Sequence, residues 1–379
     1  MPKPIFGQKS VSLWGRVNFT GVIMEISRID ARLAASSLKV TDAQWRSVLE
    51  PPFSLHGVSY DGEMGLFLRM PKEVARQVSP QVFGLNQRTA GGRVRFKTDS
   101  PYVALWCVAP AFEPMPHMPI TASHGFSVYS GGLFAGKVTP TVAEATRRDT
   151  DRISFGGVVR LGEGVKEIEI YMPLYGGVCE LLVGVQEGSE LYAPREYKYK
   201  KPIVVYGSSI TQGACASRPG NDYVMRLSRM LDAEVLNLGF SGNGNAEPAM
   251  LEYLAALDAT AYVFDYNYYS DRPDRILPKH YDVYATLRRA HPDTPILMVD
   301  KPSVLFAGGD YGIRSGMIRD TYERAKADGD ELVAMMDAKE LFGDCDADSC
   351  VVDTDHPNDL GFYRMAESMY PYLKRLLER

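Results

Sequence analysis

Long apolar runs, histidines and paired cysteines are all scarce in this sequence. No segment approaches the roughly 20 apolar residues of a membrane helix, and the N-terminal MPKPIFGQKSVSLWGRVNF has no apolar run long enough for a signal peptide. We therefore expect no membrane contact and a cytoplasmic location. The five cysteines include no CxxC pair, which excludes the disulfide framework of a small secreted domain. Cys345 and Cys350 could bridge or bind a metal, but no second ligand pair lies nearby, which favours two free thiols.

A basic surface is also lacking. The chain has 47 acidic and 42 basic side chains, with a net charge of −5. A nucleic-acid partner needs a basic face that neutralises phosphates, so this class is not indicated. With 379 residues, of which 45% are hydrophobic and 23% charged, the chain reads as globular. Because cores stop growing at about 250–300 residues, we expect two domains.

The first half has the rhythm of an all-β domain, with short segments rich in β-branched and aromatic residues. Such spacing predicts a β-sandwich or jelly roll. Thr41–Leu49, in contrast, has the pattern of a short helix capped by Thr41 or Asp42. The expected strands are Gly65–Met70, Gly92–Lys97, Tyr102–Val108, Gly125–Tyr129, Arg152–Leu161 and Glu167–Tyr171.

The rhythm changes near residue 195, after which apolar strands alternate with amphipathic helices. This alternation predicts a doubly wound parallel sheet of the flavodoxin-like kind, in a three-layer α/β/α domain. We expect residues 1–195 and 196–379 to form the two domains. Ligands of such sheets bind beyond the carboxyl ends of the strands, so the candidate chemistry lies there. The expected strands are Ile203–Tyr206, Glu234–Leu238, Ala261–Asp265, Pro295–Val299 and Leu332–Asp337. The expected helices are Asp222–Leu231, Glu247–Leu257, His280–His291, Ile313–Lys326 and Leu360–Leu377.

One candidate segment, GSSITQG at 207–213, follows the first of these strands directly. A serine there projects from the strand end into the crevice. A simple glycine-serine turn is the plainer interpretation. A phosphate-binding loop is disfavoured, because Ala214 and Cys215 stand where a lysine and a hydroxyl should follow the last glycine.

The second candidate segment, DTDHP at 353–357, precedes the final helix and holds one of only six histidines. A histidine flanked by carboxylates is a candidate base, although Asp and Pro also suit a helix start. A metal site with Asp344, Asp346 and Asp348 is a third interpretation. It lacks the glycine and the closing glutamate of a calcium loop, so a solvated loop is favoured.

The two segments complement each other chemically. A hydroxyl is a weak nucleophile that needs an adjacent base, and the base needs an orienting carboxylate. Asp353, three residues before His356, suits that role, and Asp355 is the less suitable alternative because it adjoins the histidine directly. Ser209 at a strand end and His356 in the last loop of the sheet can meet over the same crevice.

These segments resemble the sequence blocks of the SGNH (GDSL-like) hydrolases. GSSIT at 207–211 resembles the block G-D-S-x-T, in which Ser209 matches the nucleophile and Ser208 replaces the aspartate. The segment at 237–243, NLGFSGN, resembles the second block and implies an oxyanion-binding N–H at Gly242. Asp353 and His356 match the D-x-x-H block. In the third block, G-x-N-D, Asn267 matches the oxyanion asparagine, whereas Asp265 replaces the glycine.

The resemblance extends to a subgroup with an N-terminal β-sandwich and a G-x-D-L-Y motif. The segment GFSVY at 125–129 falls where the subgroup carries that motif, with Ser127 for the aspartate. A G-x-S-x-G elbow of the α/β-hydrolases fits neither Ser209 nor Ser241, because Thr211 and Asn243 stand where the second glycine should be.

The resemblance implies a serine esterase that needs no cofactor or metal, with an oxyanion hole formed by Ser209, Gly242 and Asn267. The subgroup implies small acyl groups on carbohydrates, most of all acetyl groups, and an oligosaccharide or small-molecule ester as the partner. A lipase or thioesterase for longer chains is the second interpretation, and a non-catalytic carbohydrate-binding protein the third. The sandwich domain would either flank the crevice or support a homo-oligomer.

Overall fold

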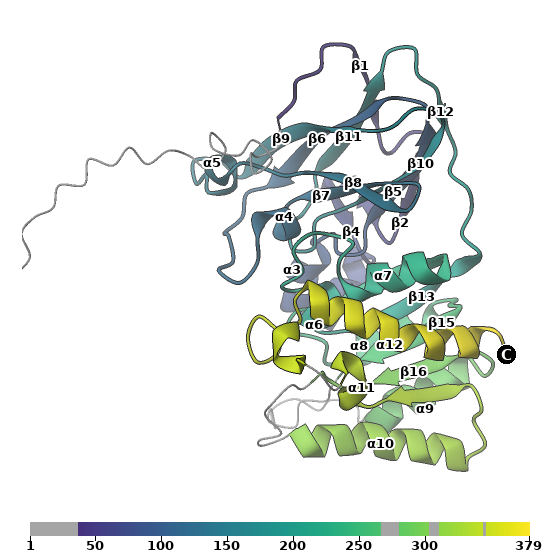
Figure 1. Cartoon of the computed structure of the whole chain (residues 1–379). Coiled ribbons are helices and arrows are strands. Elements are labelled where there is room, and N and C mark those ends of the chain that lie inside the picture. The colour runs from purple at the N-terminus through teal and green to yellow at the C-terminus, as the bar shows by residue number, and fades with distance from the viewer. Residues whose placement is uncertain (1–36, 267–279, 303–310, 344–345) are drawn as a thin grey trace, which may run out of the picture. The chain divides into compact units, whose positions relative to one another are not determined.

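Antiparallel sheets form the N-terminal part of the chain. The computed structural model describes residues 37–266, 280–302, 311–343 and 346–379. One sheet has the strand order β1-β11-β6-β9, and another has the order β12-β5-β10-β7-β8 with β2 paired to β5 (Figure 1). A third, two-stranded sheet pairs β3 with β4. The strands are β1 Ala43–Ser47, β2 Ser54–His56, β3 Ser59–Asp61, β4 Leu66–Leu68, β5 Arg93–Thr98, β6 Tyr102–Pro110, β7 Phe126–Ser130, β8 Leu133–Val138, β9 Arg152–Arg160, β10 Lys166–Tyr171, β11 Glu180–Gln186 and β12 Leu191–Tyr192.

The core of this β-rich region lies between the two larger sheets. Alternate residues of β9, among them Ile153, Phe155 and Val159, are buried, as expected for a strand with one solvated face. They share a cluster with Phe96 of β5 and Leu105 of β6, which come from different sheets. The predicted strands of the first half are all present, and the expected all-β sandwich class is confirmed. Four short helices interrupt the strands: α2 Lys72–Val78, α3 Pro80–Asn86, α4 Ile120–Ser123 and α5 Val142–Ala145.

The helix predicted at Thr41–Leu49 is wrong. Ala43–Ser47 is strand β1, antiparallel to β11. The Trp45 ring packs on Gly184 of β11, where a Cβ would approach it to 3.1 Å. Packing of this aromatic side chain over a glycine has outweighed the local helix-capping pattern, because tertiary packing commonly overrides intrinsic helix propensity.

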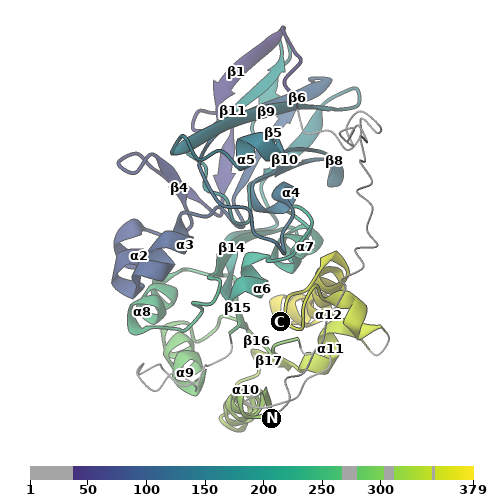
Figure 2. The same cartoon turned by 90° about the vertical axis from the view of Figure 1, so that its left-hand side faces the viewer.

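The C-terminal part is a five-stranded parallel sheet with the order β14-β13-β15-β16-β17. Ile203 and Val205 of β13 enter one core cluster with α7 and α12, and Val204 and Tyr206 enter another with α8, α9 and α10. Helices therefore cover both faces, as Figure 2 shows, and the predicted three-layer α/β/α class is confirmed. The strands are β13 Tyr199–Gly207, β14 Ala233–Gly239, β15 Ala261–Asp265, β16 Ile296–Val299 and β17 Val333–Met336. The helical elements are α6 Ser209–Gln212, α7 Tyr223–Leu231, α8 Pro248–Ala256, α9 His280–Ala290, α10 Tyr311–Ala327, α11 Ala338–Phe342, the 3₁₀ turn η2 Ala347–Cys350 and α12 Asp359–Leu377.

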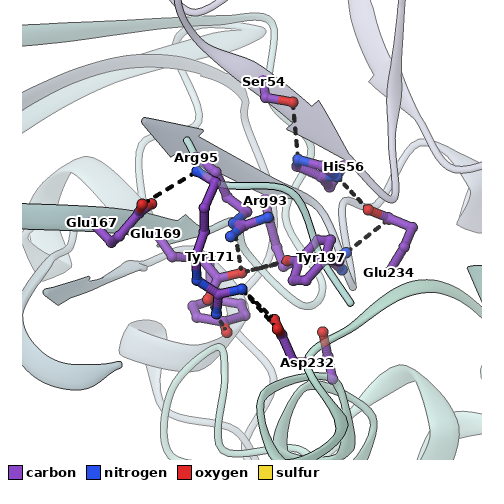
Figure 3. Close-up of polar contacts among 12 residues, drawn as sticks. Ser54, His56, Arg93, Arg95, Glu167, Glu169, Tyr171, Tyr197, Asp232 and Glu234 are labelled. Atoms are coloured by element: carbon purple, nitrogen blue, oxygen red, sulfur yellow. Dashed lines mark hydrogen bonds and ion pairs between the residues drawn. The ribbon is translucent and has the colours of Figure 1, made fainter. Parts of the chain in front are cut away.

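A buried ion pair joins the two parts of the chain. Arg93 of β5 is fully buried, and its Nη2 donates to Glu234 Oε1 of β14 at 2.8 Å. Arg93 Nη1 donates to the Val235 carbonyl at 3.2 Å, and Glu234 also bonds the His56 imidazole (Figure 3). Burial alone would raise the pKa of Glu234, but the Arg93 charge and the His56 bond outweigh it and lower that pKa. Ser36–Arg379 form one compact unit.

Within the described ranges, no helix combines the length and the apolar character needed to cross a membrane.

Candidate active site

Ser209 lies at the carboxyl end of β13, where the chain turns into the short helix α6. The turn is tight because Gly207 has no side chain: a Cβ there would lie 2.1 Å from Thr211 Oγ1 and 2.3 Å from the Asp265 carbonyl oxygen. Gly213 ends α6 with φ +99°, a conformation that favours glycine. The sequence around Ser209 thus fixes a sharp strand-to-helix turn at the edge of the sheet.

The three side chains singled out from the sequence meet at this edge. Ser209 Oγ lies 2.9 Å from His356 Nε2, and His356 Nδ1 lies 2.8 Å from Asp353 Oδ2. The loop that carries Asp353 and His356 is closed by a bridge between Val351 and Pro357 and leads into α12. Serine, imidazole and carboxylate therefore form one hydrogen-bonded chain, an arrangement suited to activating a hydroxyl.

Asp353 is held as an anion. Its Oδ1 accepts the backbone N–H groups of Asp355 at 2.8 Å and His356 at 2.7 Å, in addition to the imidazole bond at Oδ2. Partial burial would raise the pKa of Asp353, but these hydrogen bonds outweigh it and lower the pKa to about 2. A carboxylate in this state favours one imidazole tautomer, with the proton on Nδ1 and the lone pair on Nε2 facing Ser209.

Asp355, the alternative orienting acid, bonds elsewhere. Its Oδ1 lies 2.6 Å from Lys301 Nζ, at the end of β16. Of the two carboxylates that flank His356, Asp353 is the one whose bond to the imidazole the structure describes.

A pocket of about 280 Å³ opens beside Ser209. Gly242 borders it with φ +65° and open space where a side chain would point, so its backbone is accessible there. Polar groups and glycines dominate the wall. The lining residues are Ser208, Ser209, Ile210, Ser241, Gly242, Gly244, Asp265, Lys301, Asp355 and His356.

Two members of the predicted oxyanion hole, Ser209 and Gly242, border this one pocket. The third, Asn267, lies outside the described residues. Asp265, where the family motif has glycine, is buried, and its Oδ2 accepts hydrogen bonds from Thr211 Oγ1 and Tyr223 Oη, both at 2.8 Å. Burial raises the pKa of Asp265.

His117 lies near His356, a proximity that the sequence did not indicate. Its ring centroid lies 6.1 Å from that of His356, although it belongs to the segment between β6 and α4 of the β-rich region. Met118 of this segment packs into the core cluster that contains Cys215, and Thr121 Oγ1 donates to the Ser217 carbonyl at 2.7 Å. The one signal in the sequence is a histidine in a proline-rich loop, EPMPHMP at 113–119, which does not reveal what the loop contacts.

Among the residues with described positions, no group of three or more His, Cys, Asp or Glu side chains is arranged to hold a metal ion. Cys350 is a free thiol that accompanies the 3₁₀ turn η2. Asp346 lies in the left-handed region at φ 51° before that turn, and its carbonyl accepts the Ser349 N–H at 3.1 Å. Asp344 and Cys345 lie outside the described residues.

Two family models of SGNH-type hydrolases match successive parts of the chain. Residues 200–374 match the GDSL-like lipase/acylhydrolase family model, and residues 43–191 match the GxDLY model, the N-terminus of SGNH-hydrolase-type esterases. A GDSL-like lipase-family protein from Bacteroides ovatus is 29% identical with a TM-score of 0.74, over 89% of this chain and 98% of that one.

Two further solved structures share the fold. The salicylyl-acyltransferase SsfX3 of a tetracycline biosynthetic pathway is 21% identical with a TM-score of 0.70, over 89% of this chain and 98% of that one. A family two carbohydrate esterase from Cellvibrio japonicus is 13% identical with a TM-score of 0.55, over the same shares. None of the curated proteins compared matches the chain.

Proposed function

Because the chain belongs to the SGNH (GDSL-like) hydrolases with an N-terminal GxDLY domain, we propose that it is a serine esterase that removes small acyl groups, most of all acetyl, from carbohydrates. The observation that carries this proposal is the hydrogen-bonded chain from Ser209 through His356 to Asp353 beside a small, polar pocket.

Ser209 is the proposed nucleophile. His356 Nε2 accepts the hydroxyl proton as Oγ attacks the ester carbonyl, and then delivers it to the departing alcohol oxygen. Asp353 holds the imidazole through Nδ1 and stabilises the imidazolium while it carries the proton. Water then attacks the acyl-serine by the same route, which releases the carboxylic acid and restores the Ser209 hydroxyl.

The oxyanion formed in each step requires nearby donors. We assign the backbone N–H groups of Ser209 and Gly242 to this role, with the side-chain amide of Asn267 as the third donor. Each donor of this kind typically contributes about 10²–10³ in turnover. The accessible backbone at Gly242 supports the assignment.

The pocket supports a short acyl group. Its volume of about 280 Å³ lies just below the range of drug-sized ligand sites, roughly 300–1,000 Å³. A long acyl chain requires a continuous apolar wall, whereas here Ser208, Ser241, Asp265 and Lys301 border the space. The lipase or thioesterase alternative is therefore less favoured than an acetylesterase.

A carbohydrate leaving group fits the polar rim. Lys301 and Asp355 offer a donor and an acceptor beside His356, and His117 adds an exposed imidazole from the β-rich region. We propose that His117 contacts the sugar, so that the crevice has walls from both parts of the chain. The similarity to carbohydrate esterases of family two is compatible with this substrate class.

The acyl-length proposal is tested by comparing kcat/KM for p-nitrophenyl acetate and p-nitrophenyl octanoate. We expect kcat/KM for the acetate ester to be at least about tenfold higher, because the acyl chain of the octanoate ester requires space for six more methylenes. A clear preference for octanoate would overturn the acetylesterase and support the long-chain alternative. Labelling of Ser209 by a fluorophosphonate separates both from a non-catalytic binding protein, which would stay unlabelled.

A further inference from the structure

A second pocket, here called the junction pocket, has a volume of about 450 Å³ and shares no lining residue with the pocket beside Ser209. Strands β5 and β10, the segment after β12, and helix α7 all contribute to its wall. Six formally charged side chains line it: Arg95, Arg195, Arg229, Glu167, Glu169 and Asp232. None of them has a part in the proposed hydrolysis.

Arg95 is a buried cation with an unmet donor. Arg95 is only 5% exposed. The central carbon of its guanidinium lies 3.8 Å from the centroid of the Tyr197 ring, and its Nε lies 3.9 Å from Glu169 Oε1. Its Nη1 is buried and has no hydrogen-bond partner in the described structure. A buried donor without a partner is unfavourable unless a ligand or water meets it.

Two further unmet atoms belong to the same wall. Glu167 Oε1 accepts the Arg195 backbone N–H at 3.2 Å, but Glu167 Oε2 has no partner among the described groups. Arg229 Nη2 donates to the Gly220 carbonyl at 2.7 Å, whereas Arg229 Nη1 has none there. The pocket wall thus has two unmet donors and one unmet acceptor.

The wall is rigidly braced beneath these atoms. Glu169 accepts hydrogen bonds from Tyr197 Oη and Tyr171 Oη, both at 2.7 Å, and Figure 3 shows these side chains gathered beside Arg93 and Arg95. Tyr197 Oη also accepts from Arg93 Nε at 3.1 Å. Such a preformed wall loses little side-chain freedom when a ligand binds.

The charges decide which ligand suits the pocket. Three arginines and three carboxylates line it, so its formal charge is balanced. A phosphate or carboxylate would bind the guanidinium groups but would also lie against the carboxylates of Glu169, Asp232 and Glu167, of which Glu167 has Lys97 Nζ 3.7 Å from its Oε1. A hydroxyl group both accepts from a guanidinium and donates to a carboxylate, so a ligand with several hydroxyls suits a wall that contains both kinds of group.

We propose that the junction pocket binds a sugar unit of an uncharged carbohydrate, as a site separate from the one that holds Ser209. The inference rests on the charge balance and the unmet atoms, and it stands whether or not the chain hydrolyses sugar esters.

The test is calorimetric titration of the full chain with unacetylated xylotriose, mannotriose and cellotriose, and with inorganic phosphate. In Glu167→Gln, an amide donor replaces the unmet acceptor, while the oxygen that accepts from Arg195 is kept. We expect at least one trisaccharide to bind the wild type saturably and at least tenfold more weakly to Glu167→Gln. Glu163→Gln, in the exposed turn before β10, is the matched control and should bind as the wild type does.

Arg95→Lys is a second variant that removes the unmet guanidinium donor and is expected to weaken binding similarly. Thermal unfolding and hydrolysis of p-nitrophenyl acetate, both expected to be unchanged in Glu167→Gln, report on folding and on the Ser209 site separately. Absence of saturable sugar binding, equal binding by wild type and Glu167→Gln, or saturation by phosphate alone would each overturn the proposal.

Discussion

The carboxylate of Asp355 is bound to the ammonium of Lys301, 2.6 Å away, and not to the imidazole of its sequence neighbour His356. This pair leaves Asp353 as the acid on His356 Nδ1. Because both partners of the pair also border the pocket beside Ser209, they are placed to contact a substrate while the triad remains intact.

We predict that Asp353→Asn and Asp355→Asn have very different effects. Loss of the Asp353 charge removes the group that fixes the imidazole tautomer, so kcat should fall by about 10²–10⁴. Asp355→Asn leaves that bond in place and should change kcat less than about tenfold. Steady-state hydrolysis of p-nitrophenyl acetate by the two variants measures this. A larger loss in Asp355→Asn would reverse the assignment.

The low pKa of Asp353 predicts a pH-dependent contribution to stability. Its pKa is lowered from 3.8 to about 2 in the folded chain, so the carboxylate stabilises the fold above pH 3.8 and this contribution is lost as the pH falls through about 2. Because the side chain is 47% exposed, the effect should be small. Urea unfolding of wild type and Asp353→Asn should differ most near pH 6 and converge toward pH 2. A difference that grows in acid would contradict the hydrogen-bonded anion.

His117→Ala should separate sugar binding from chemistry. Loss of one contact of about 1.4 kcal/mol would raise KM for an acetylated xylo-oligosaccharide about tenfold. The kcat for p-nitrophenyl acetate, which has no sugar, should stay within about twofold. Glu113→Ala, an exposed change in the same loop, is the control. If His117→Ala and the wild type had equal KM and kcat on both substrates, His117 would not contact the sugar.

Glu234→Ala should destabilise the folded chain by about 3 kcal/mol, because it removes the nearer of the two carboxylates beside the buried Arg93 guanidinium, while Glu169 Oε1 stays 3.7 Å from Arg93 Nε. Glu252→Ala, at an exposed position of α8, is the matched control and should change the free energy of unfolding by less than about 0.5 kcal/mol. Chemical denaturation measures both. Equal effects would mean that Arg93 finds another partner.

The sequence predicted the strands in which buried residues recur with a regular period. Apolar strands such as Ile203–Tyr206 and the alternating Arg152–Leu161 were identifiable because their periodicity reflects one or two buried faces. The approach of Ser209 to His356, 147 residues apart, was predictable because both follow from recognisable blocks at the edge of a parallel sheet.

Features that depend on packing between distant segments were not predictable. Trp45 belongs to strand β1, where its ring packs on Gly184 of β11, a residue far along the chain. Arg93 and Arg95 look like the exposed face of a strand, yet both are buried against other elements. His117 approaches the site only because the two parts of the chain meet there. No local pattern records any of these contacts.

The central claim is that Ser209 is the nucleophile of an acetylesterase, and the most direct test is acetate release by wild type and Ser209→Ala in parallel. The substrates are p-nitrophenyl acetate and acetylated xylo-oligosaccharides. We predict that the wild type releases acetate from both and that the variant loses at least about 10³ in turnover, as expected when a triad member is removed. Equal release by the two proteins would contradict a serine mechanism at this site.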